Sequence, residues 1–223
     1  RDFGNNTTVE ANRMSELLLN NTNVSEKVTI SSCIHEMHAG GRSDSLTIRI
    51  DDSESQFDKW GIQTGSPVEY RDSGAASGKM YLYSAAPEYG YYILRAYSMP
   101  VSGTIPNTKP WERVHFAQIG EEIAARHGLE FESYGLDDIA YQYRAQEKQE
   151  DFKFFGQLCT LERAALIIFD GRLIAAYEPY LESAEPTATI DTAGCVVECE
   201  DRSLLEYGAA KVSSGPYSGI FKA

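Results

Sequence analysis

One stretch of the chain, from Trp111 to Tyr177, alternates helical patterns with strand patterns, and this order limits the possible folds more than any other feature. After Lys109-Pro110-Trp111-Glu112, apolar residues recur at three- and four-residue spacing, which predicts an amphipathic helix that ends at Gly128. The residues on the apolar side of this helix are Phe116, Ile119, Ile123, Ala124 and His127.

A strand and a second helix are predicted next. Residues 139–146 alternate apolar with polar or small side chains, as a half-buried strand does. The second helix follows Gln149-Glu150-Asp151, because acidic side chains suit the positive end of a helix dipole. Its apolar face comprises Phe152, Phe155, Leu158 and Cys159.

A hairpin closes this segment. The apolar run 164–169 meets Asp170-Gly171 and continues as Arg172-Leu173-Ile174, and Asp-Gly between two such runs is a strong hairpin signal. No catalytic signature accompanies these elements. The sequence therefore predicts an architectural α/β unit.

The regions on either side of this unit have strand patterns. Before it, short alternating segments are separated by Gly, Ser, Asp and Pro clusters, which predicts a small antiparallel barrel or a curled sandwich. These segments are residues 28–30, 46–50, 68–70, 80–83 and 91–97. After Tyr177, strand patterns resume at residues 187–191, 195–200, 209–212 and 219–221.

The predicted fold class is α+β, mainly β: an antiparallel barrel-like module, an inserted two-helix α/β unit and the start of a second β module. The expected parts are a flexible lead-in (1–16), a first β-barrel-like domain (17–103), the α/β insert (104–177) and a truncated second β module (178–223). Because the chain begins with Arg rather than Met and stops soon after Phe221, we expect a fragment of a longer protein.

Composition and charge exclude several functional classes. With 223 residues and 42% hydrophobic content, the chain can bury a substantial core. The formal charge of -13 argues against broad contact with nucleic-acid phosphates, which needs clustered Lys and Arg, and we expect no sequence-specific nucleic-acid binding. The chain has no run of about 18 apolar residues and no signal-peptide core, so we expect no membrane span.

The four cysteines do not form a zinc framework. Cys33, Cys159, Cys195 and Cys199 lack the spacing of paired C-x-x-C motifs. Cys195 and Cys199 fall on one predicted strand, where residues four apart are separated by roughly 13 Å and cannot join each other. We therefore expect free thiols and a reducing compartment.

Two groups of polar residues could suggest chemistry, and both have a structural explanation. His35 and His38 are three residues apart on a predicted strand, so they face opposite sides instead of sharing a metal ion. Glu121-Glu122 with Arg126-His127 could form an acid–base cluster. On a helix, however, Glu122 and Arg126 favour a surface ion pair, and the neighbouring histidine suits a helix C-terminus.

The glycine-rich and tyrosine-rich segments also favour structural roles. Residues 74–78 precede a strand rather than a helix, so they predict a hairpin tip and not a phosphate-binding loop. Tyr89, Tyr91 and Tyr92 could form a platform for a carbohydrate or peptide, although tyrosines on strands usually pack. We expect no catalytic, cofactor-binding or metal-binding residues and no cofactor.

Short phrases that occur in order along the chain carry a family resemblance. They are Leu17–Ser25, Ser43–Ile48, Gly65–Glu69, Gly78–Tyr81, Leu94–Ser98, Trp111–Leu129, Gln149–Leu158 and Gly171–Leu173. Each is a strand, a turn or a helix face. Together they resemble the baseplate hub proteins of contractile-tailed phages, prophages and phage-like particles, the late control gene D-like tail proteins.

The resemblance implies a virion structural protein without enzymatic activity. It implies a homotrimer in which two β-barrel-like modules per subunit form a pseudo-sixfold ring that joins a sixfold tail tube to a threefold spike. The partners implied are the tail tube protein, the spike protein and other baseplate proteins. The location implied is the tail baseplate of a virion or phage-like particle, assembled in the cytoplasm of a bacterial host.

Two alternatives from other classes stay open. A tail-associated cell-wall hydrolase would need paired carboxylates or a metal site, and the sequence does not assemble one. A cell-wall-binding module would recognise carbohydrate through the tyrosines.

Overall fold

The computed structural model describes residues 15–186 apart from Ala39, Gly41, Gln56, Ser73 and Gly74, together with the backbone of residues 209–214 and 217–222. The chain divides into two units, Arg1–Ala184 and Glu185–Ala223. Antiparallel strands dominate and three α-helices accompany them in the described part, so the predicted α+β, mainly β class is confirmed.

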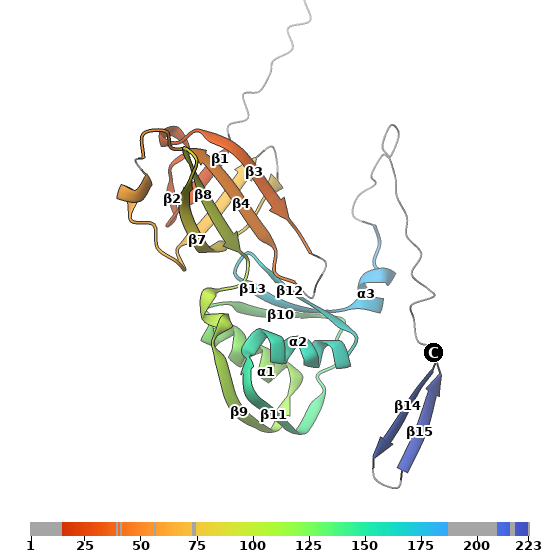
Figure 1. Ribbon diagram of the computed structural model, residues 1–223. Coiled ribbons are helices and arrows are strands. Elements are labelled where there is room, and N and C mark those ends of the chain that lie inside the picture. The colour runs from red at the N-terminus through yellow and green to blue at the C-terminus, as the bar shows by residue number, and fades with distance from the viewer. Residues whose placement is uncertain are drawn as a thin grey trace, which may run out of the picture. The chain divides into compact units, whose positions relative to one another are not determined.

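The first unit begins with an antiparallel sheet, which we call the N-terminal β module (Figure 1). Its strands follow the order β2-β1-β5-β7-β8-β4-β3, and β6 pairs with β5. The elements are β1 (Glu16–Leu19), β2 (Thr22–Asn23), η1 (Ser25–Lys27), β3 (Ile30–Glu36), β4 (Ser45–Asp51), η2 (Phe57–Trp60), β5 (Pro67–Asp72), β6 (Ala75–Ala76), β7 (Met80–Glu88) and β8 (Tyr91–Tyr97). The strands predicted around residues 46–50, 68–70, 80–83 and 91–97 are all present, whereas the strand predicted at residues 28–30 begins only at Ile30 and continues to Glu36.

The sheet curls around a single apolar core. Alternate residues of each strand point inward, as the period of a strand requires, so Leu46, Ile48 and Ile50 of β4 are buried together. Leu17 of β1 and Cys33 of β3 belong to the same cluster although their strands lie near opposite ends of the strand order. The sheet is therefore barrel-like in its packing, while no backbone ladder joins β2 to β3 among the described residues.

The rest of the first unit is an α/β module with thin sheets and helices. Its elements are η3 (Val101–Thr104), β9 (Pro106–His115), α1 (Phe116–Arg126), β10 (Glu130–Tyr134), β11 (Ala140–Glu150), α2 (Asp151–Leu161), β12 (Ala164–Phe169), β13 (Arg172–Tyr177) and α3 (Glu178–Ser183). A three-stranded sheet has the order β10-β13-β12, and β9 pairs with β11 in a two-stranded ribbon.

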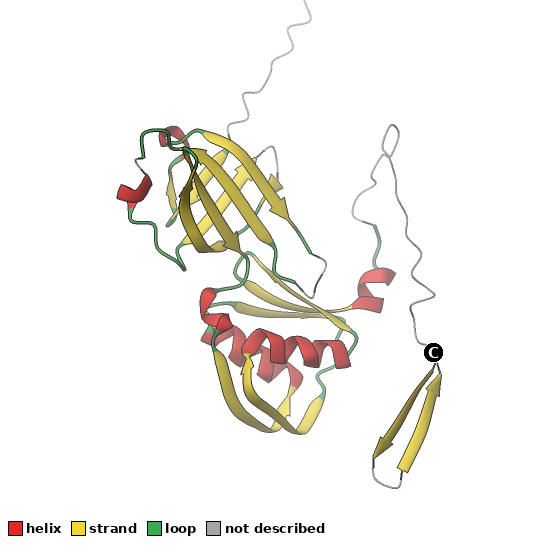
Figure 2. Ribbon diagram, in the orientation of Figure 1, coloured by secondary structure: helices red, strands yellow, loops and turns green. Residues whose placement is uncertain are grey.

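Helices α1 and α2 lie between the three-stranded sheet and the ribbon (Figure 2). Both helices bury the face that their spacing predicted, including Ile119 and Ile123 of α1 and Phe155 of α2. The rings of Phe116 and Phe155 lie 5.0 Å apart between centroids, and Phe131 of β10 contacts Phe155 edge-on at 5.8 Å. Trp111 of the ribbon stacks on Phe154. One aromatic core thus joins all three layers.

The predicted hairpin at residues 164–174 is confirmed. Strands β12 and β13 pair antiparallel, with Phe169 opposite Arg172. Asp170 and Gly171 have φ angles of 48° and 75°, the left-handed conformation that a two-residue hairpin turn needs. Asp and Gly are among the residues that adopt it at low cost.

Three local details differ from the sequence-based expectation. The stretch from Pro100 to Pro110 contains η3 and the start of β9 instead of an irregular connection. Trp111 lies on β9, and the first helix begins only at Phe116. A short helix, α3, follows Tyr177 directly. The prolines inside β9 argue against a strand in the sequence. They are tolerated here because β9 pairs with a strand on one side only.

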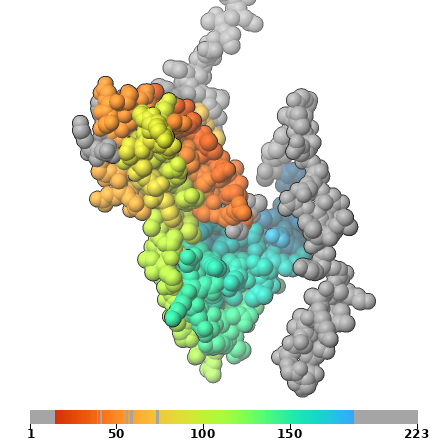
Figure 3. Space-filling model, viewed as in Figure 1, coloured from red at the N-terminus to blue at the C-terminus, as the bar shows by residue number. Residues whose placement is uncertain are grey.

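The two modules of the first unit contact each other directly. The Lys79 N–H donates to Asp170 Oδ1 at 3.1 Å, so the β12–β13 turn is fixed to the start of β7. Tyr81 and Met99 pack against the core of the α/β module. Figure 3 is a space-filling view of this unit, with the N-terminal β module in red to yellow and the α/β module in green to blue.

The second unit contains one described hairpin. Strands β14 (Ala209–Ser214) and β15 (Tyr217–Lys222) pair antiparallel, at the place where the sequence predicts strands 209–212 and 219–221. The strands predicted at residues 187–191 and 195–200 lie outside the described residues.

Candidate functional site

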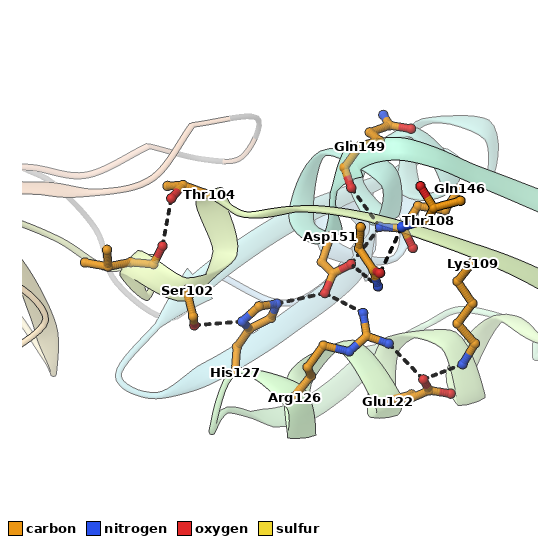
Figure 4. A network of polar contacts seen from close by, with 12 residues as sticks. Ser102, Thr104, Thr108, Lys109, Glu122, Arg126, His127, Gln146, Gln149 and Asp151 are labelled. Carbon is orange, nitrogen blue, oxygen red and sulfur yellow. Dashed lines mark hydrogen bonds and ion pairs between the residues drawn. The ribbon is translucent and has the colours of Figure 1, made fainter.

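The densest polar network in the described part of the chain surrounds Asp151, the first residue of α2 (Figure 4). Its side chain is only 2% exposed. A carboxylate at the first turn of a helix is favoured by the helix dipole, as the acidic residues before Phe152 predicted. A buried carboxylate also needs hydrogen-bond donors, because its desolvation is costly.

Four side chains from three other elements donate to Asp151. Arg126 Nη1 lies 2.6 Å and His127 Nε2 lies 2.9 Å from Oδ2. Gln146 Nε2 lies 2.6 Å from Oδ1, and Asn107 Nδ2 is at 3.5 Å from the same oxygen. The carboxylate therefore connects the end of α1, both ribbon strands and the start of α2.

The donors around Asp151 change its acidity. Burial alone raises the pKa of the carboxyl group, but the hydrogen bonds from Gln146, His127 and Arg126 outweigh burial and leave the pKa below its ordinary value. Asp151 is consequently a stable anion at neutral pH. It is a poor candidate for a general base, which needs a pKa near the working pH.

The network continues to the surface through Arg126. Its Nη2 lies 2.9 Å from Glu122 Oε1, which confirms the ion pair predicted on this helix. Lys109 of β9 binds the same Glu122 oxygen and also lies over the Trp111 ring, 3.9 Å from its centroid. The residues predicted as a surface pair are thus the outer part of a larger network.

His127 connects Asp151 to Ser102. The imidazole is 5% exposed, and its Nδ1 lies 2.8 Å from Ser102 Oγ. Because carboxylate oxygens only accept hydrogen bonds, Nε2 carries the proton toward Asp151. In the neutral ring, Nδ1 then accepts the hydrogen bond of the exposed Ser102 hydroxyl.

Local sequence explains how Ser102 reaches this position. It belongs to η3, whose next residue is Gly103. A Cβ atom at Gly103 would lie 2.1 Å from the Phe152 ring, so only glycine allows η3 to approach α2 this closely. Phe152 also packs against the His127 ring at 4.8 Å between centroids.

A serine, a histidine and an aspartate in a hydrogen-bonded chain invite comparison with a nucleophilic triad. Two features differ from that mechanism. Asp151 already pairs with Arg126, which neutralises the charge that would stabilise an imidazolium ion. Neither Ser102 nor His127 lines the cavity over α2 and β12 or the cavity on the N-terminal β module. The arrangement is well suited to holding η3, α1 and α2 together.

The histidines singled out by the sequence do not meet in one site. His35 lies half-buried on β3, and His38 follows the end of that strand. Among the described residues, no group of three His, Cys, Asp or Glu side chains could hold a metal ion. The backbone N–H of His38 donates to Asp44, which fixes the β3–β4 connection.

The cysteines and tyrosines follow mainly structural patterns. Cys33 and Cys159 are free thiols, and burial raises the pKa of Cys159 to about 12, which makes it unreactive. Cys195 and Cys199 lie outside the described residues. Tyr92 packs on Phe57 and Tyr91 lies under Arg49, whereas Tyr89 at the β7–β8 turn is 93% exposed.

The fold matches solved structures of tail proteins, two of which are described as prophage proteins. The tail protein from Neisseria meningitidis MC58 gives a TM-score of 0.64 and 11% identity, covering 95% of this chain and 67% of that chain. The 43 kDa tail protein of prophage MuSo2 from Shewanella oneidensis gives a TM-score of 0.58 and 10% identity, covering 73% of this chain and 55% of that chain. Prophage tail protein gp18 from Listeria monocytogenes EGD-e gives a TM-score of 0.51 and 10% identity, covering 94% of this chain and 60% of that chain. The chain has a prophage tail protein fold.

The relationship is visible in structure rather than in sequence. No protein-family profile and no curated protein matches the chain. The chain spans between 55% and 67% of the length of the three tail proteins. The predicted resemblance to phage tail proteins is confirmed at the level of the fold. Within the described residues, no helix is long and apolar enough to cross a membrane.

The sequence did not predict the Asp151 network. Side chains that bond directly in it lie up to 44 residues apart along the chain, as Asn107 and Asp151 do. Only Glu122 and Arg126 have the helical spacing that reveals a pair. The remaining contacts depend on how η3, the ribbon and the two helices pack.

Proposed function

We propose that this chain is a structural component of a contractile phage tail or phage-like particle, in the baseplate hub that joins the tail tube to the central spike. The observation that carries the proposal is the structural match to the Neisseria tail protein over 95% of this chain. The family phrases from Leu17 to Leu173 add the narrower assignment to the hub. The chain acts without catalysis and assembles as a homotrimer.

The free strand edges of the N-terminal β module support assembly into a ring. In the described sheet, β2 and β3 end the strand order, so each has one edge without a strand partner. Ile34 on β3 is 57% exposed, which is unusual for an edge strand that must avoid other chains. A ring of identical subunits needs complementary surfaces on different sides of one subunit.

The charge of the chain suits a channel that conducts DNA. With 33 acidic and 20 basic residues, the formal charge is -13. An acidic inner wall repels phosphates and lets DNA slide without sticking. A hub ring with a basic or neutral lumen would contradict this part of the proposal.

The proposal is tested by locating the protein on tail particles. Antibodies raised against this chain and coupled to gold should label the distal end of the tail tube in electron micrographs, most clearly on particles stripped of their sheath. Preimmune antibodies provide the control. Label that is absent from exposed tube ends would contradict the hub assignment.

A cell-wall hydrolase is the alternative that one observation favours, namely the chain of hydrogen bonds from Ser102 through His127 to Asp151. Purified protein incubated with peptidoglycan should release no soluble fragments if the role is structural. Release that disappears in Ser102→Ala would establish the hydrolase instead. The same substitution removes the hydrogen bond between Ser102 and His127, so unchanged circular dichroism of the variant is the control that its fold is kept.

A further inference from the structure

The outer face of the N-terminal β module carries a cavity of about 560 Å³, which we call the β-face hollow. It lies over β3, β4, β8 and β7, which are neighbours in the strand order (Figure 1). The apolar core of the module lies on the opposite face of these strands. The volume of the hollow is within the range of small-molecule binding sites.

Strand register places the lining side chains in two adjacent rows. In one row, Glu36 of β3 is opposite Ser45 of β4, which is opposite Tyr97 of β8. In the next row, Thr47 of β4 is opposite Arg95 of β8. The β4 and β8 members alternate with buried residues, so they point away from the core. Polar groups of three strands therefore meet at one place.

A β-bulge adds a second aromatic ring to these rows. The pairing of β7 with β8 shifts between Leu82 and Ser84, so Tyr83 is an extra residue on β7. Tyr83 and Tyr97 both line the hollow, and their ring centroids lie 4.8 Å apart in an edge-on arrangement. Bulges commonly re-aim a side chain beside a binding site. Here the bulge supplies an aromatic pair to a polar hollow.

The ionisable groups of the hollow are two arginines, one histidine and one glutamate. Arg42 forms no ion pair within the described residues. The side chain of Arg95 is 49% exposed, and its ion pair with a nearby carboxylate is long at 3.9 Å, so its charge remains available. Glu36 is the acidic member, and its Oε2 already accepts the hydroxyl of Ser45. The basic groups, which include His38, thus outnumber the acidic one.

A second cavity, over α2 and β12, meets the hollow at Arg42. Its acidic residues, Glu150 and Glu178, line that cavity and not the hollow. Burial, together with the charge of Glu150, raises the pKa of Tyr83, so this phenol stays neutral. Arg95 lines the hollow alone and is therefore the better position for an anionic group of a ligand.

Several polar groups in the hollow have unused hydrogen-bonding capacity. The hydroxyls of Thr47 and Tyr97 and the imidazole of His38 have no hydrogen-bond partner within the described residues. Hydroxyl and imidazole groups can both donate and accept. A sugar ring matches this combination, because it has hydroxyl groups around its rim and an apolar face of C–H groups that packs on aromatic rings.

We infer that the β-face hollow binds a short saccharide that carries a carboxylate. The apolar face of a sugar ring packs against Tyr97, its hydroxyls bond to Thr47 and His38, and its carboxylate takes hydrogen bonds from the Arg95 guanidinium. The inference goes beyond the hub role and does not depend on it. It also uses tyrosines other than Tyr89, Tyr91 and Tyr92 of the sequence-based hypothesis.

Titration calorimetry of the whole chain with two matched disaccharides tests the class of ligand. N-acetylglucosaminyl-N-acetylmuramic acid carries a carboxylate, and chitobiose has the same linkage without one. Both should bind, the acidic disaccharide about tenfold more tightly, because hydrogen bonds between a carboxylate and a guanidinium are charge-assisted. Absence of binding by both disaccharides would overturn the inference, and equal affinity for the two would overturn the role of the carboxylate.

Variants locate the binding site. Arg95→Met should reduce the affinity for the acidic disaccharide to that for chitobiose and leave chitobiose binding unchanged. Tyr97→Ala should weaken the binding of both about tenfold, whereas Tyr97→Phe keeps the ring and most of the affinity.

The matched controls lie outside the hollow. Arg113→Met changes an exposed arginine on β9, and Tyr89→Ala changes a tyrosine that is 93% exposed. Both controls should bind like wild type, and unchanged circular dichroism establishes that every variant folds. Controls as weak as the hollow variants, or an Arg95→Met variant that still prefers the acidic disaccharide, would overturn the inference.

Failure of this inference differs from failure of the proposed function. Gold label at the tube end without saccharide binding would retain the hub and reject the β-face hollow as a site. Saccharide binding that depends on Arg95 and Tyr97, without label on tail particles, would do the reverse.

Discussion

The N-terminal β module closes its core with one large sheet, whereas the α/β module joins two thin sheets through two helices. The first core consists mainly of apolar inward-facing strand residues, joined by Val24 and Phe57 from the connections, and the buried carboxylates of this module, Asp44 and Asp52, lie at the two ends of β4. The second core is aromatic, and beside it lies the buried carboxylate of Asp151 with its four donors. A module with thin sheets has more layers to connect. A carboxylate that accepts hydrogen bonds from several elements fixes the relative positions of these elements.

The difference has a physical basis. A continuous backbone ladder sets the distances within the N-terminal β module, so apolar side chains need only fill the interior. Between the ribbon, the helices and the three-stranded sheet of the α/β module no such ladder exists. Directional hydrogen bonds to Asp151 supply part of the geometry that a ladder would otherwise provide.

The largest expected effect comes from the centre of the aromatic core. Phe155→Ala removes a fully buried ring that contacts Phe116 and Phe131, and should lower the free energy of unfolding by about 4 kcal/mol. Urea unfolding followed by circular dichroism measures the loss. Leu94→Ala in the N-terminal β module is the matched comparison, with a smaller expected loss of about 3 kcal/mol. A larger loss for the leucine variant would reverse the comparison of the two cores.

The second effect tests the buried carboxylate itself. Asp151→Ala leaves His127 Nε2 without its acceptor and removes one of the two acceptors of Gln146 Nε2, the other being the Gln149 carbonyl. It should lower the free energy of unfolding by about 3 kcal/mol, moderated because Arg126 is partly exposed. The control is Asp137→Asn, which neutralises a carboxylate on an exposed connection. It should change the free energy of unfolding by less than about 0.5 kcal/mol. If both variants unfold at the same urea concentration, the α/β module does not depend on Asp151.

The sequence predicted the elements of both modules better than the way they meet. Spacing alone identified the buried faces of α1 and α2, and Asp170-Gly171 identified the β12–β13 turn. Strand β9 was missed because two prolines and few apolar residues mark it as a connection. Its strand character comes from pairing with β11, which no local pattern records.

The Asp151 network was missed for a related reason. Acidic residues before a helix predict a favourable dipole interaction, and this accounts for the position of Asp151 but not for its partners. Those partners come from β9, the end of α1 and β11, and η3 joins the network through His127. Only tertiary packing brings these elements together.

Lowering the pH should reduce the contribution of Asp151 to the free energy of unfolding and leave that of the apolar core unchanged. The pKa of Asp151 is lower in the folded protein than its ordinary value of 3.8, so its stabilising effect is fully present above that value. The effect is lost as the pH falls through the lowered folded pKa. The difference in unfolding free energy between wild type and Asp151→Asn should therefore narrow below about pH 4. The difference between wild type and Leu94→Ala should stay constant over the same range, and a parallel narrowing there would assign the acid effect to other groups.

The smallest expected effect concerns the contact between the two modules. Asp170 accepts a hydrogen bond from the Lys79 N–H and has a positive φ angle. Asp170→Gly keeps the turn conformation but removes the acceptor, and should lower the free energy of unfolding by about 1 kcal/mol. Asp170→Asn keeps both the turn and an acceptor oxygen, so it serves as the control. Hydrogen exchange of the Lys79 amide should accelerate in the glycine variant alone. Equal exchange in both variants would show that side-chain packing around Tyr81 and Met99, rather than this hydrogen bond, joins the modules.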